Sequence, residues 1–321
     1  MGMGELPENT RRMLRCPVCT APLIPGDARD ELSCTNVQGG HRFPIVGGIP
    51  VLIDESSSVF RLDDFIRQRS TTFRPTSRAR RWLTGLLPEL GETLVTATNY
   101  RTLAALLLQR GGRPQVLVIG GSIAGRGMGD ILVNPLIELT ETDVSFGPRT
   151  ALICDAHDLP FTDGAFDGVI AQAVLEHVAD PYRCVEEIHR VLREDGLVYA
   201  ETPFMQQVHM GPYDFTRFTH LGHRRLFRKF DEIASGAGGG PGAALAWSAT
   251  YFLLGFVRSK TAIAAIKTLT RLTLFWLKYF DRYLIDKPGA LDGSWGYYFL
   301  GRRGRDVLSD RALVELYRGI L

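Results

Sequence analysis

Residues 116–127, VLVIGGSIAGRG, constrain the fold of this chain more than any other segment. An unbroken apolar run leads directly into a turn that holds Gly120, Gly121 and Gly125. Such a run, without polar alternation, is typical of a strand buried on both faces of a parallel sheet. Glycines let a ligand approach the backbone, because no Cβ stands in the way. We therefore expect this segment to form the first half of a nucleotide-type cofactor site.

The segments that follow alternate between strand and helix. Strands separated by helices indicate an α/β fold with a doubly wound, parallel sheet. Ligands in such sheets bind beyond the carboxyl ends of the strands, so we expect the candidate residues there. We predict strands over residues 115–121, 136–145, 149–158, 166–174 and 196–204, a helix that opens within 127–133, and an amphipathic helix over 181–193.

Two features near the glycine-rich turn fit a cofactor that carries a ribose. The amides that open the next helix favour a carboxylate or phosphate group, and Ser122 adds a donor. Asp143 ends the second strand, 23 residues after Gly120. Its carboxylate can accept hydrogen bonds from both ribose hydroxyls. Glu141 is a rival for this role, and the choice between the two stays open.

The segment ICDAHDLPFTDGAFDGVIAQAVLEHVADP, residues 153–181, resembles a known family. It is similar to the class I S-adenosylmethionine-dependent methyltransferases, in the subgroup with a D-A-x-x-L-P-F segment, an F-D strand start and an L-E-H-V helix entry. The resemblance covers roughly residues 113–232, with a last strand at 293–303, and implies a seven-stranded, Rossmann-like methyltransferase sheet. The residues that carry it are Asp155, Ala156, Leu159, Pro160, Phe161, Phe166, Asp167, Leu175, Glu176, His177 and Val178.

The resemblance implies a role for each cofactor-binding residue. Asp155 would accept from the adenine amino group, and the Ala156 amide would donate to the ring. Asp143 would hold the ribose, and the turn at 120–125 would carry the methionine end. Gln172 and Ala173 would line the sulfonium side.

The glycine-rich turn departs from the pattern of that family. The family usually has an acidic residue where this chain has Val118, and a G-x-G-x-G run where this chain has GGSIAG. Ser122 replaces the middle glycine, and the last glycine is Ala124 or is displaced to Gly125. In the family, the carboxylate at the position of Val118 is expected to orient the ammonium group of the cofactor. Without it, either another residue takes this role or the affinity for the cofactor is lower. We expect an atypical turn that still binds the cofactor; a degenerate site is the alternative.

Methyl transfer asks the protein to hold a nucleophile in line with the sulfonium and to remove its proton. The reaction itself requires no metal. Residues 203–227 follow the fifth strand, where the family places substrate contacts. We predict that His177 and His209 accept the proton and that Tyr213, Asp214 and Arg217 position the substrate.

The front segment, residues 13–55, contains three of the five cysteines: Cys16, Cys19 and Cys34. It resembles the short zinc-ribbon-like domains that also supply activator subunits to tRNA and ribosomal methyltransferases, on the motifs Cys16-Pro17-x-Cys19 and FPIVGGIPVL (43–52). A tetrahedral zinc ion needs four ligands, and His41 is the nearest replacement for the missing fourth cysteine. The alternative is a metal-free relic. In either case the domain offers a surface for a protein partner.

Two segments outside the motifs are expected to be helical: a connector between the front segment and the main domain, and an insertion within the main domain. Residues 56–112 form a helical connector in which Arg78, Arg80 and Arg81 either contact a phosphate or form a solvated face. Residues 113–321 make up the methyltransferase domain, with a helical insertion over about 243–285 before the last strand. Its apolar run, 243–257, is only 15 residues long and is too short for a membrane span.

The second half of this insertion is amphipathic. Apolar residues lie on one helical face and basic residues on another, so residues 261–283 either cap the substrate cleft or touch a membrane surface and admit a lipid-linked substrate. The apolar face is Ile266, Leu269, Leu272 and Phe275, and the basic face is Lys267, Arg271 and Lys278.

The sequence thus predicts an S-adenosylmethionine-dependent methyltransferase that acts on oxygen or nitrogen of a small-molecule or glycan-type substrate. A net charge of +2 gives no global field for nucleic acid, and no DNA partner is expected. The N-terminus lacks the features of a secretory signal, so we expect a cytoplasmic protein, with membrane association if the amphipathic helix binds lipid. The alternatives are a non-catalytic scaffold, which the altered turn favours, and an RNA or protein methyltransferase, which the front domain suggests.

Overall fold

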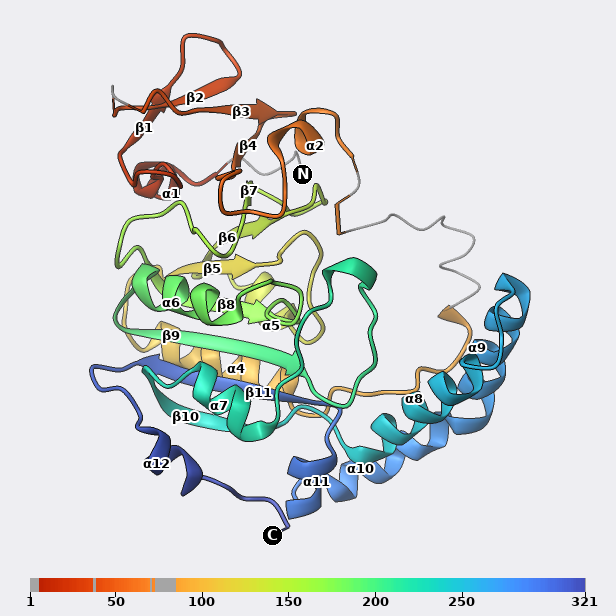
Figure 1. Cartoon of the computed structure of the whole chain (residues 1–321). Coiled ribbons are helices and arrows are strands. Elements are labelled where there is room, and N and C mark those ends of the chain that lie inside the picture. Colours follow the sequence, from red (N-terminus) through yellow and green to blue (C-terminus); the bar gives the residue numbers. More distant parts are fainter. Residues whose placement is uncertain (1–5, 37–38, 70, 73–84, 321) are drawn as a thin grey trace.

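The computed structural model describes residues 6–36, 39–69, 71–72 and 85–320 (Figure 1). Within these residues an eleven-stranded sheet has the strand order β1-β2-β3-β4-β7-β6-β5-β8-β9-β11-β10. The strands are β1 (Leu23–Pro25), β2 (Glu31–Cys34), β3 (Arg42–Val46), β4 (Ile49–Leu52), β5 (Gln115–Ile119), β6 (Glu138–Asp143), β7 (Leu152–Cys154), β8 (Phe166–Gln172), β9 (Leu192–Pro203), β10 (Phe230–Ala237) and β11 (Gly296–Arg303).

The centre of the sheet is parallel, as the alternation of strands and helices predicts. Strands β7, β6, β5, β8 and β9 pair in parallel in that order. The strand order changes direction between β5 and β8, which is where doubly wound sheets bind their ligands. Beyond β9 the sheet turns antiparallel, because β11 pairs with both β9 and β10 in that sense. This part of the molecule has the Rossmann-like arrangement expected from the sequence.

The N-terminal strands β1 to β4 continue this sheet, so the β-rich front segment expected from the sequence is joined to the central strands. Strand β4 pairs in parallel with β7, in the register Val51 to Ile153 and Leu52 to Cys154. The side chains of Leu14 and Phe43 belong to the same hydrophobic core as those of the central strands. Figure 1 shows β1 to β4 at the top of the molecule, continuing the sheet.

Helices cover both faces of the central strands. On one face α6 packs into the largest core through Cys184, Val185 and Ile188. On the other face α4 buries Tyr100, Leu103 and Leu107 in a second core. The helices are α1 (Glu8–Met13), α2 (Leu62–Ile66), α4 (Thr96–Leu108), α5 (Gly129–Leu132), α6 (Pro181–Val191), α7 (His220–Leu226), α8 (Pro241–Leu254), α9 (Lys260–Leu274), α10 (Lys278–Leu284), α11 (Pro288–Gly293) and α12 (Asp310–Val314), with short 3₁₀ turns η1 (Gly211–Tyr213) and η2 (Phe275–Leu277).

Local sequence signals explain where α6 and α4 begin and end. Asp180 caps α6, because its carboxylate accepts from the amides of Tyr182 and Arg183, and Pro181 fills the first turn. The helix α4 is followed by Gly111 and Gly112, both at positive φ.

Three sequence-based expectations need correction or lie outside the described residues. The helix expected within 127–133 is only the single turn α5, which starts after Met128. The L-E-H-V segment is a turn and not a helix entry, because the helix begins at Pro181. The connector residues Arg78, Arg80 and Arg81 fall outside the described residues.

The insertion before the last strand forms an arm of antiparallel helices. Helix α8 packs against α9, η2 and α10, and the arm projects from the body of the molecule (Figure 1). The predicted apolar face of α9 is only partly covered, since Leu269 and Leu272 remain more than half exposed. In the described part of the chain, no helix combines the length and apolarity that crossing a membrane requires.

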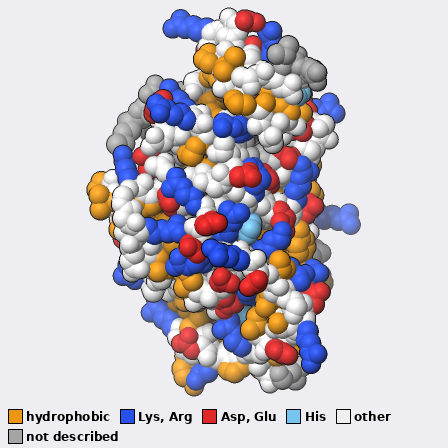
Figure 2. All heavy atoms as spheres, turned by 90° about the vertical axis from the view of Figure 1, so that its left-hand side faces the viewer, with side chains coloured by type: hydrophobic (Ala, Val, Ile, Leu, Met, Phe, Trp, Pro, Cys, Tyr) orange, Lys and Arg blue, Asp and Glu red, His pale blue; other side chains and the backbone are white. Residues whose placement is uncertain are grey.

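The surface in Figure 2, which is the left-hand side of Figure 1, carries both signs of charge. Blue and red side chains lie intermixed over the middle of this face, and hydrophobic side chains gather toward the N-terminal end. This mixture agrees with a net charge of only +2.

Candidate functional site

The site is a cavity of about 630 Å³ at the carboxyl ends of the five central strands. Each of these strands contributes a residue at or just beyond its end. Gly120 follows β5, Asp143 ends β6, Asp155 follows β7, Gln172 ends β8 and Glu201 lies near the end of β9. The parallel arrangement therefore brings together residues that lie up to 81 positions apart in the sequence.

The glycines of the turn after β5 are required by close packing. Gly120 has a φ of +73°, and a Cβ there would lie 2.5 Å from Cγ2 of Val174. A Cβ on Gly125 would lie 2.0 Å from Oε1 of Gln172. Gly121, whose amide donates to the carbonyl of Thr142 at 2.8 Å, fixes the turn to the neighbouring strand. The turn is thus well ordered without the G-x-G-x-G pattern.

The structure distinguishes between Asp143 and Glu141, the two candidates for the ribose contact. Asp143 is buried and lines the cavity, and its Oδ2 accepts from the amide of Ser122 at 3.1 Å. Burial raises the pKa of Asp143, although hydrogen bonds from Ser122 oppose the shift. Glu141 pairs with Arg149 at 2.6 Å and does not line the cavity. Asp143 is therefore the carboxylate that a bound ligand can reach.

Asp155 follows the neighbouring strand β7 and is held by side chains on both of its carboxylate oxygens. Its Oδ1 accepts from the amide of His157 at 3.0 Å and lies 2.5 Å from Nδ1 of the same residue. The hydroxyl of Ser58 donates to Oδ2 at 2.5 Å. Burial favours the neutral acid, but these hydrogen bonds outweigh it and lower the pKa of Asp155. The amide of Ala156 lies beside this carboxylate in the cavity wall.

The predicted sulfonium side consists of Gln172 and Ala173. Gln172 accepts from the hydroxyl of Tyr100 at 3.0 Å and donates to the Arg126 carbonyl at 3.1 Å. Ala173 has a φ of +54°, an uncommon value for a residue with a Cβ. Both residues line the cavity. A backbone held in this region of φ is frequent at ligand sites.

Sequence reasoning missed Glu201, a buried carboxylate in the cavity wall. Oε1 accepts from the hydroxyl of Thr96 at 2.6 Å and from that of Tyr199, and Oε2 accepts from Gln172 at 2.8 Å. Glu201 has no ion-pair partner among the described residues. The only sequence signal was an acidic residue in the otherwise apolar run LVYAETP.

The acceptor side of the cavity brings together the two predicted histidines and one missed carboxylate. The rings of His177 and His209 meet edge to face, with centroids 4.8 Å apart. Glu176 is 1% exposed, and neither of its carboxylate oxygens has a hydrogen-bond partner. Nε2 of His177 lies 3.6 Å from Oε1 of Glu176. Burial raises the pKa of Glu176 to about 8, and burial together with His209 lowers the pKa of His177 to about 4.

The other three predicted catalytic residues lie outside the cavity wall. Asp214 and Arg217 form an ion pair at 2.5 Å, and Asp214 also accepts from the amide of His209 at 2.8 Å. Tyr213 stacks on Phe60, and its carbonyl oxygen is 2.7 Å from Nδ1 of His177. These residues therefore hold the two histidines in place and do not contact the cavity themselves.

Aromatic side chains from the arm close the cavity. Trp247 of α8 and Trp295, just before β11, both line it, and their rings lie 5.7 Å apart at 77°. Gly91 lies under Trp247, where a Cβ would come within 2.8 Å of the indole. The insertion thus contributes to the cavity through α8, while the amphipathic face of α9 points elsewhere.

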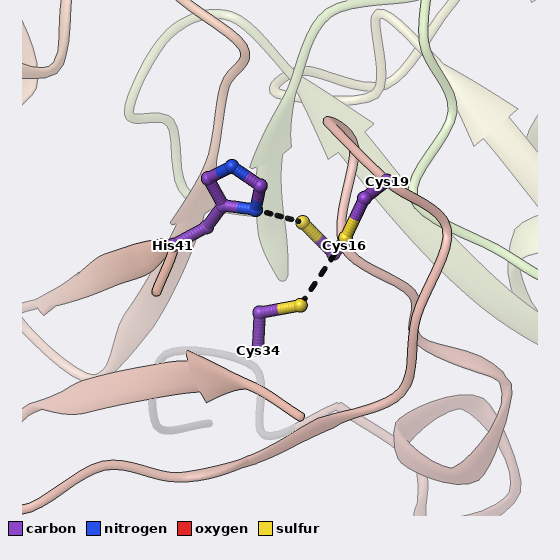
Figure 3. Close-up of side chains that lie close together, drawn as sticks. All are labelled: Cys16, Cys19, Cys34 and His41. Atoms are coloured by element: carbon purple, nitrogen blue, oxygen red, sulfur yellow. Dashed lines mark hydrogen bonds between the residues drawn. The ribbon is translucent and has the colours of Figure 1, made fainter. Parts of the chain in front are cut away.

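The predicted metal ligands of the front segment are assembled as expected. Figure 3 shows Cys16, Cys19, Cys34 and His41 converging on one point. The sulfur of Cys16 lies 3.4 Å from Nδ1 of His41, and the sulfurs of Cys19 and Cys34 are 3.3 Å apart. All four ligand atoms lie within 4.8 Å of one another. Three sulfurs and one imidazole nitrogen form a set that suits tetrahedral zinc.

Residues 135–200 match the family model described as a methyltransferase domain. This span includes Asp143, Asp155 and Gln172 at the ends of β6, β7 and β8. It also includes the acceptor-side pair Glu176 and His177. The methyltransferase domain match therefore coincides with the strand ends that line the cavity.

The curated relative with a significant match is the human mitochondrial protein arginine-hydroxylase NDUFAF5, at 35% identity over 68 residues. These residues are 21% of this chain and 19% of that protein, so the chain matches about a fifth of the length of this relative.

Similar solved structures share low sequence identity with this chain. Phosphoethanolamine N-methyltransferase 2 of Haemonchus contortus, solved with phosphomonomethylethanolamine and S-adenosylhomocysteine, has a TM-score of 0.40 and 15% identity, over 67% of this chain and 56% of that chain. The YcgJ protein from Bacillus subtilis has a TM-score of 0.35 and 14% identity, over 64% of this chain and all of that chain.

Proposed function

We propose that this protein is an S-adenosylmethionine-dependent methyltransferase. The observation that carries the proposal is the cavity to which five parallel strands each deliver one residue. Asp143 and Asp155 occupy the positions that the family resemblance gives to the ribose and adenine contacts. The methyltransferase domain match over residues 135–200 supports the same conclusion.

The charges around the cavity favour a cationic ligand. Asp143, Glu176 and Glu201 are buried in its wall, and none has a Lys or Arg partner among the described residues. Arg126, which also lines the cavity, is paired with Glu89 at 2.9 Å. Buried carboxylates without a counter-ion are costly, so a ligand with positive charge is stabilised here. S-adenosylmethionine carries a sulfonium and an ammonium group.

Glu201 is the residue that we assign to the ammonium group. The usual acidic residue is replaced by Val118, which is buried in the wall of the same cavity. Glu201 lies across the wall beside Gln172, and its carboxylate is oriented by three donors. A carboxylate fixed in this way binds a cation without further reorganisation. The atypical turn therefore has a substitute for its missing charge.

The two histidines lie where methyl transfer needs a base. A nucleophilic oxygen or nitrogen of the acceptor attacks the methyl carbon, the carbon–sulfur bond breaks, and its electron pair stays on sulfur as the neutral thioether. The proton of the acceptor leaves to a base. An imidazole nitrogen of His177 or His209, which both lie on this side of the cavity, can be that base.

The acceptor is a small molecule or a glycan-type unit. The cavity volume of about 630 Å³ lies within the range of small-molecule sites and must also hold the cofactor. Trp247 and Trp295 offer apolar ring faces to the acceptor. For the front segment, we propose one zinc ion bound by Cys16, Cys19, Cys34 and His41, because the four donors already converge.

Calorimetric titration with S-adenosylmethionine tests the proposed function. We expect the wild-type protein to bind with a Kd in the micromolar range. Asp143→Asn should weaken binding about tenfold or more, because a hydrogen bond to a charged group contributes about 1.5–3 kcal/mol. Glu141→Gln is the matched control, since Glu141 lies two residues away on the same strand and outside the cavity. Absence of binding to the wild type would overturn the proposal.

A further inference from the structure

We infer that Glu176, His177 and His209 form a binding site for one divalent cation on the acceptor side of the cofactor cavity. One ligand atom from each of these residues lies within 4.8 Å of the others. All three side chains line the cavity. They come from two segments, the turn after β8 and the loop between β9 and α7, so the fold itself brings them together.

The state of Glu176 is the first observation that points to a ligand. Its side chain is 1% exposed, and both carboxylate oxygens lack a hydrogen-bond partner in the described part of the chain. A buried carboxylate that accepts no hydrogen bond is strongly unfavourable unless something else compensates it. Arg217, the cationic side chain whose charge acts on Glu176, is already paired with Asp214. A bound cation would supply the missing partner.

The hydrogen bonds of the two imidazole rings are the second observation. Nδ1 of His177 lies 2.7 Å from the carbonyl oxygen of Tyr213, to which it donates as N–H. Nδ1 of His209 lies 3.3 Å from the carbonyl oxygen of Gln207 and 3.4 Å from Oδ2 of Asp214. This arrangement leaves the lone pair of Nε2 available in both rings. Metal-ligating histidines are held in the same way, with the outer nitrogen donating to a carbonyl or carboxylate.

The donor set defines the class of cation. Two imidazoles and one carboxylate suit divalent first-row ions such as Mn²⁺, Fe²⁺ and Zn²⁺, and three protein ligands leave coordination positions open. The thiolate-rich front cluster has a different preference, because soft sulfur ligands select zinc and carboxylate ligands suit Mn²⁺. The two sites can therefore be distinguished by the choice of ion.

The consequence for catalysis rests on the proposed function. A divalent cation lowers the pKa of a hydroxyl that binds it, so an acceptor hydroxyl would be deprotonated at neutral pH. The three ligand residues line the cavity in which the acceptor must lie, so an acceptor oxygen would have access to the cation. The cation would thus orient the acceptor oxygen and activate it, and the hydroxyl proton would pass to solvent. His177 and His209 would then be ligands of the cation and would no longer serve as the proton-accepting bases.

Titration of the full-length protein with Mn²⁺, followed by the electron paramagnetic resonance signal of the free ion, tests the inference. We expect one Mn²⁺ per chain. His209→Gln and Glu176→Gln should each weaken its binding at least about tenfold. His209→Gln is the safer variant for folding, because His209 lies on an exposed loop. His189→Gln is the matched control, since His189 lies on α6 and does not line the cavity.

Each outcome is decisive for the cation site. Loss of Mn²⁺ binding in His209→Gln, with retention in His189→Gln and in Cys16→Ser, supports it. No bound Mn²⁺ at millimolar concentration, or equal binding in both histidine variants, overturns it. Titration of the same samples with S-adenosylmethionine separates this inference from the proposed function. Cation binding without cofactor binding would leave the site intact and remove the methyltransferase proposal, and the reverse result would remove only the cation site.

Discussion

Glu201 is the residue to which we assign the negative charge that the glycine-rich turn lacks. The carboxylate is 7% exposed and accepts from Thr96, Tyr199 and Gln172. Three donors fix the carboxylate, but none of them is a cation that would pair with it. The positive charge of the cofactor would do so. Its position near the end of β9 places it on the same cavity as the turn in which Val118 replaces an acidic residue.

The variant Glu201→Gln tests this assignment. We expect the affinity for S-adenosylmethionine to fall about 10- to 100-fold, because a charge-assisted contact is lost while the shape is kept. S-adenosylhomocysteine has the ammonium group but no sulfonium, so it should lose the same factor in a calorimetric titration. Glu194→Gln, at the exposed start of the same strand, should change neither affinity. A loss confined to S-adenosylmethionine would instead assign Glu201 to the sulfonium.

The site residues that were predicted are marked by local sequence patterns, whereas those that were missed depend on tertiary contacts. Asp155 follows the apolar run ALIC, and Asp143 ends a predicted strand 23 residues after Gly120, so the end of a strand marked both residues. Glu176, although part of the quoted L-E-H-V motif, was not assigned a role, because burial without a partner is a tertiary property. His157 was equally hidden, since its bond to Asp155 depends on the local turn.

At the scale of elements, the parallel strands were predictable and their partners were not. Strands β5, β8 and β9 each contain an apolar run and lie near their predicted positions, although β9 begins at Leu192, four residues before its predicted start. The pairing of β4 with β7 joins residues about 100 positions apart, and no local pattern specifies such a contact. The same pairing explains why the front segment, which buries little surface alone, is ordered as part of the larger core.

This pairing predicts that β4 and the central strands β5 to β9 unfold together. Leu52 is fully buried in the core shared by both parts. Leu52→Ala should lower the free energy of unfolding by about 2–5 kcal/mol. All four tryptophans lie after residue 55, so tryptophan fluorescence in a denaturant titration reports on the part of the chain that follows the front segment. Ile24→Ala, at an exposed position of β1, is the control. An unchanged fluorescence transition in Leu52→Ala would show that the two parts unfold independently.

At the scale of the whole molecule, a single sheet links two candidate metal sites. The zinc site lies in the outermost strands and loops of the N-terminal end, and the cofactor cavity lies at its centre. The sheet and the common core connect them, because β3 and β4 continue into β7. A metal ion that stabilises the front segment would therefore also stabilise the strands that carry Asp143 and Asp155.

Zinc removal should consequently lower the stability of the entire chain. We expect one zinc per chain by elemental analysis, and a chelator should lower the melting temperature by several degrees, because a ligand bound only to the folded state stabilises it. The measurement is made in the His209→Gln variant, so that loss of a cation from the cavity does not contribute. Cys19→Ser should reproduce the effect of the chelator and abolish any further response to it. Chelation that leaves both the fold and the melting temperature unchanged would show instead that the front segment is held by its own apolar core.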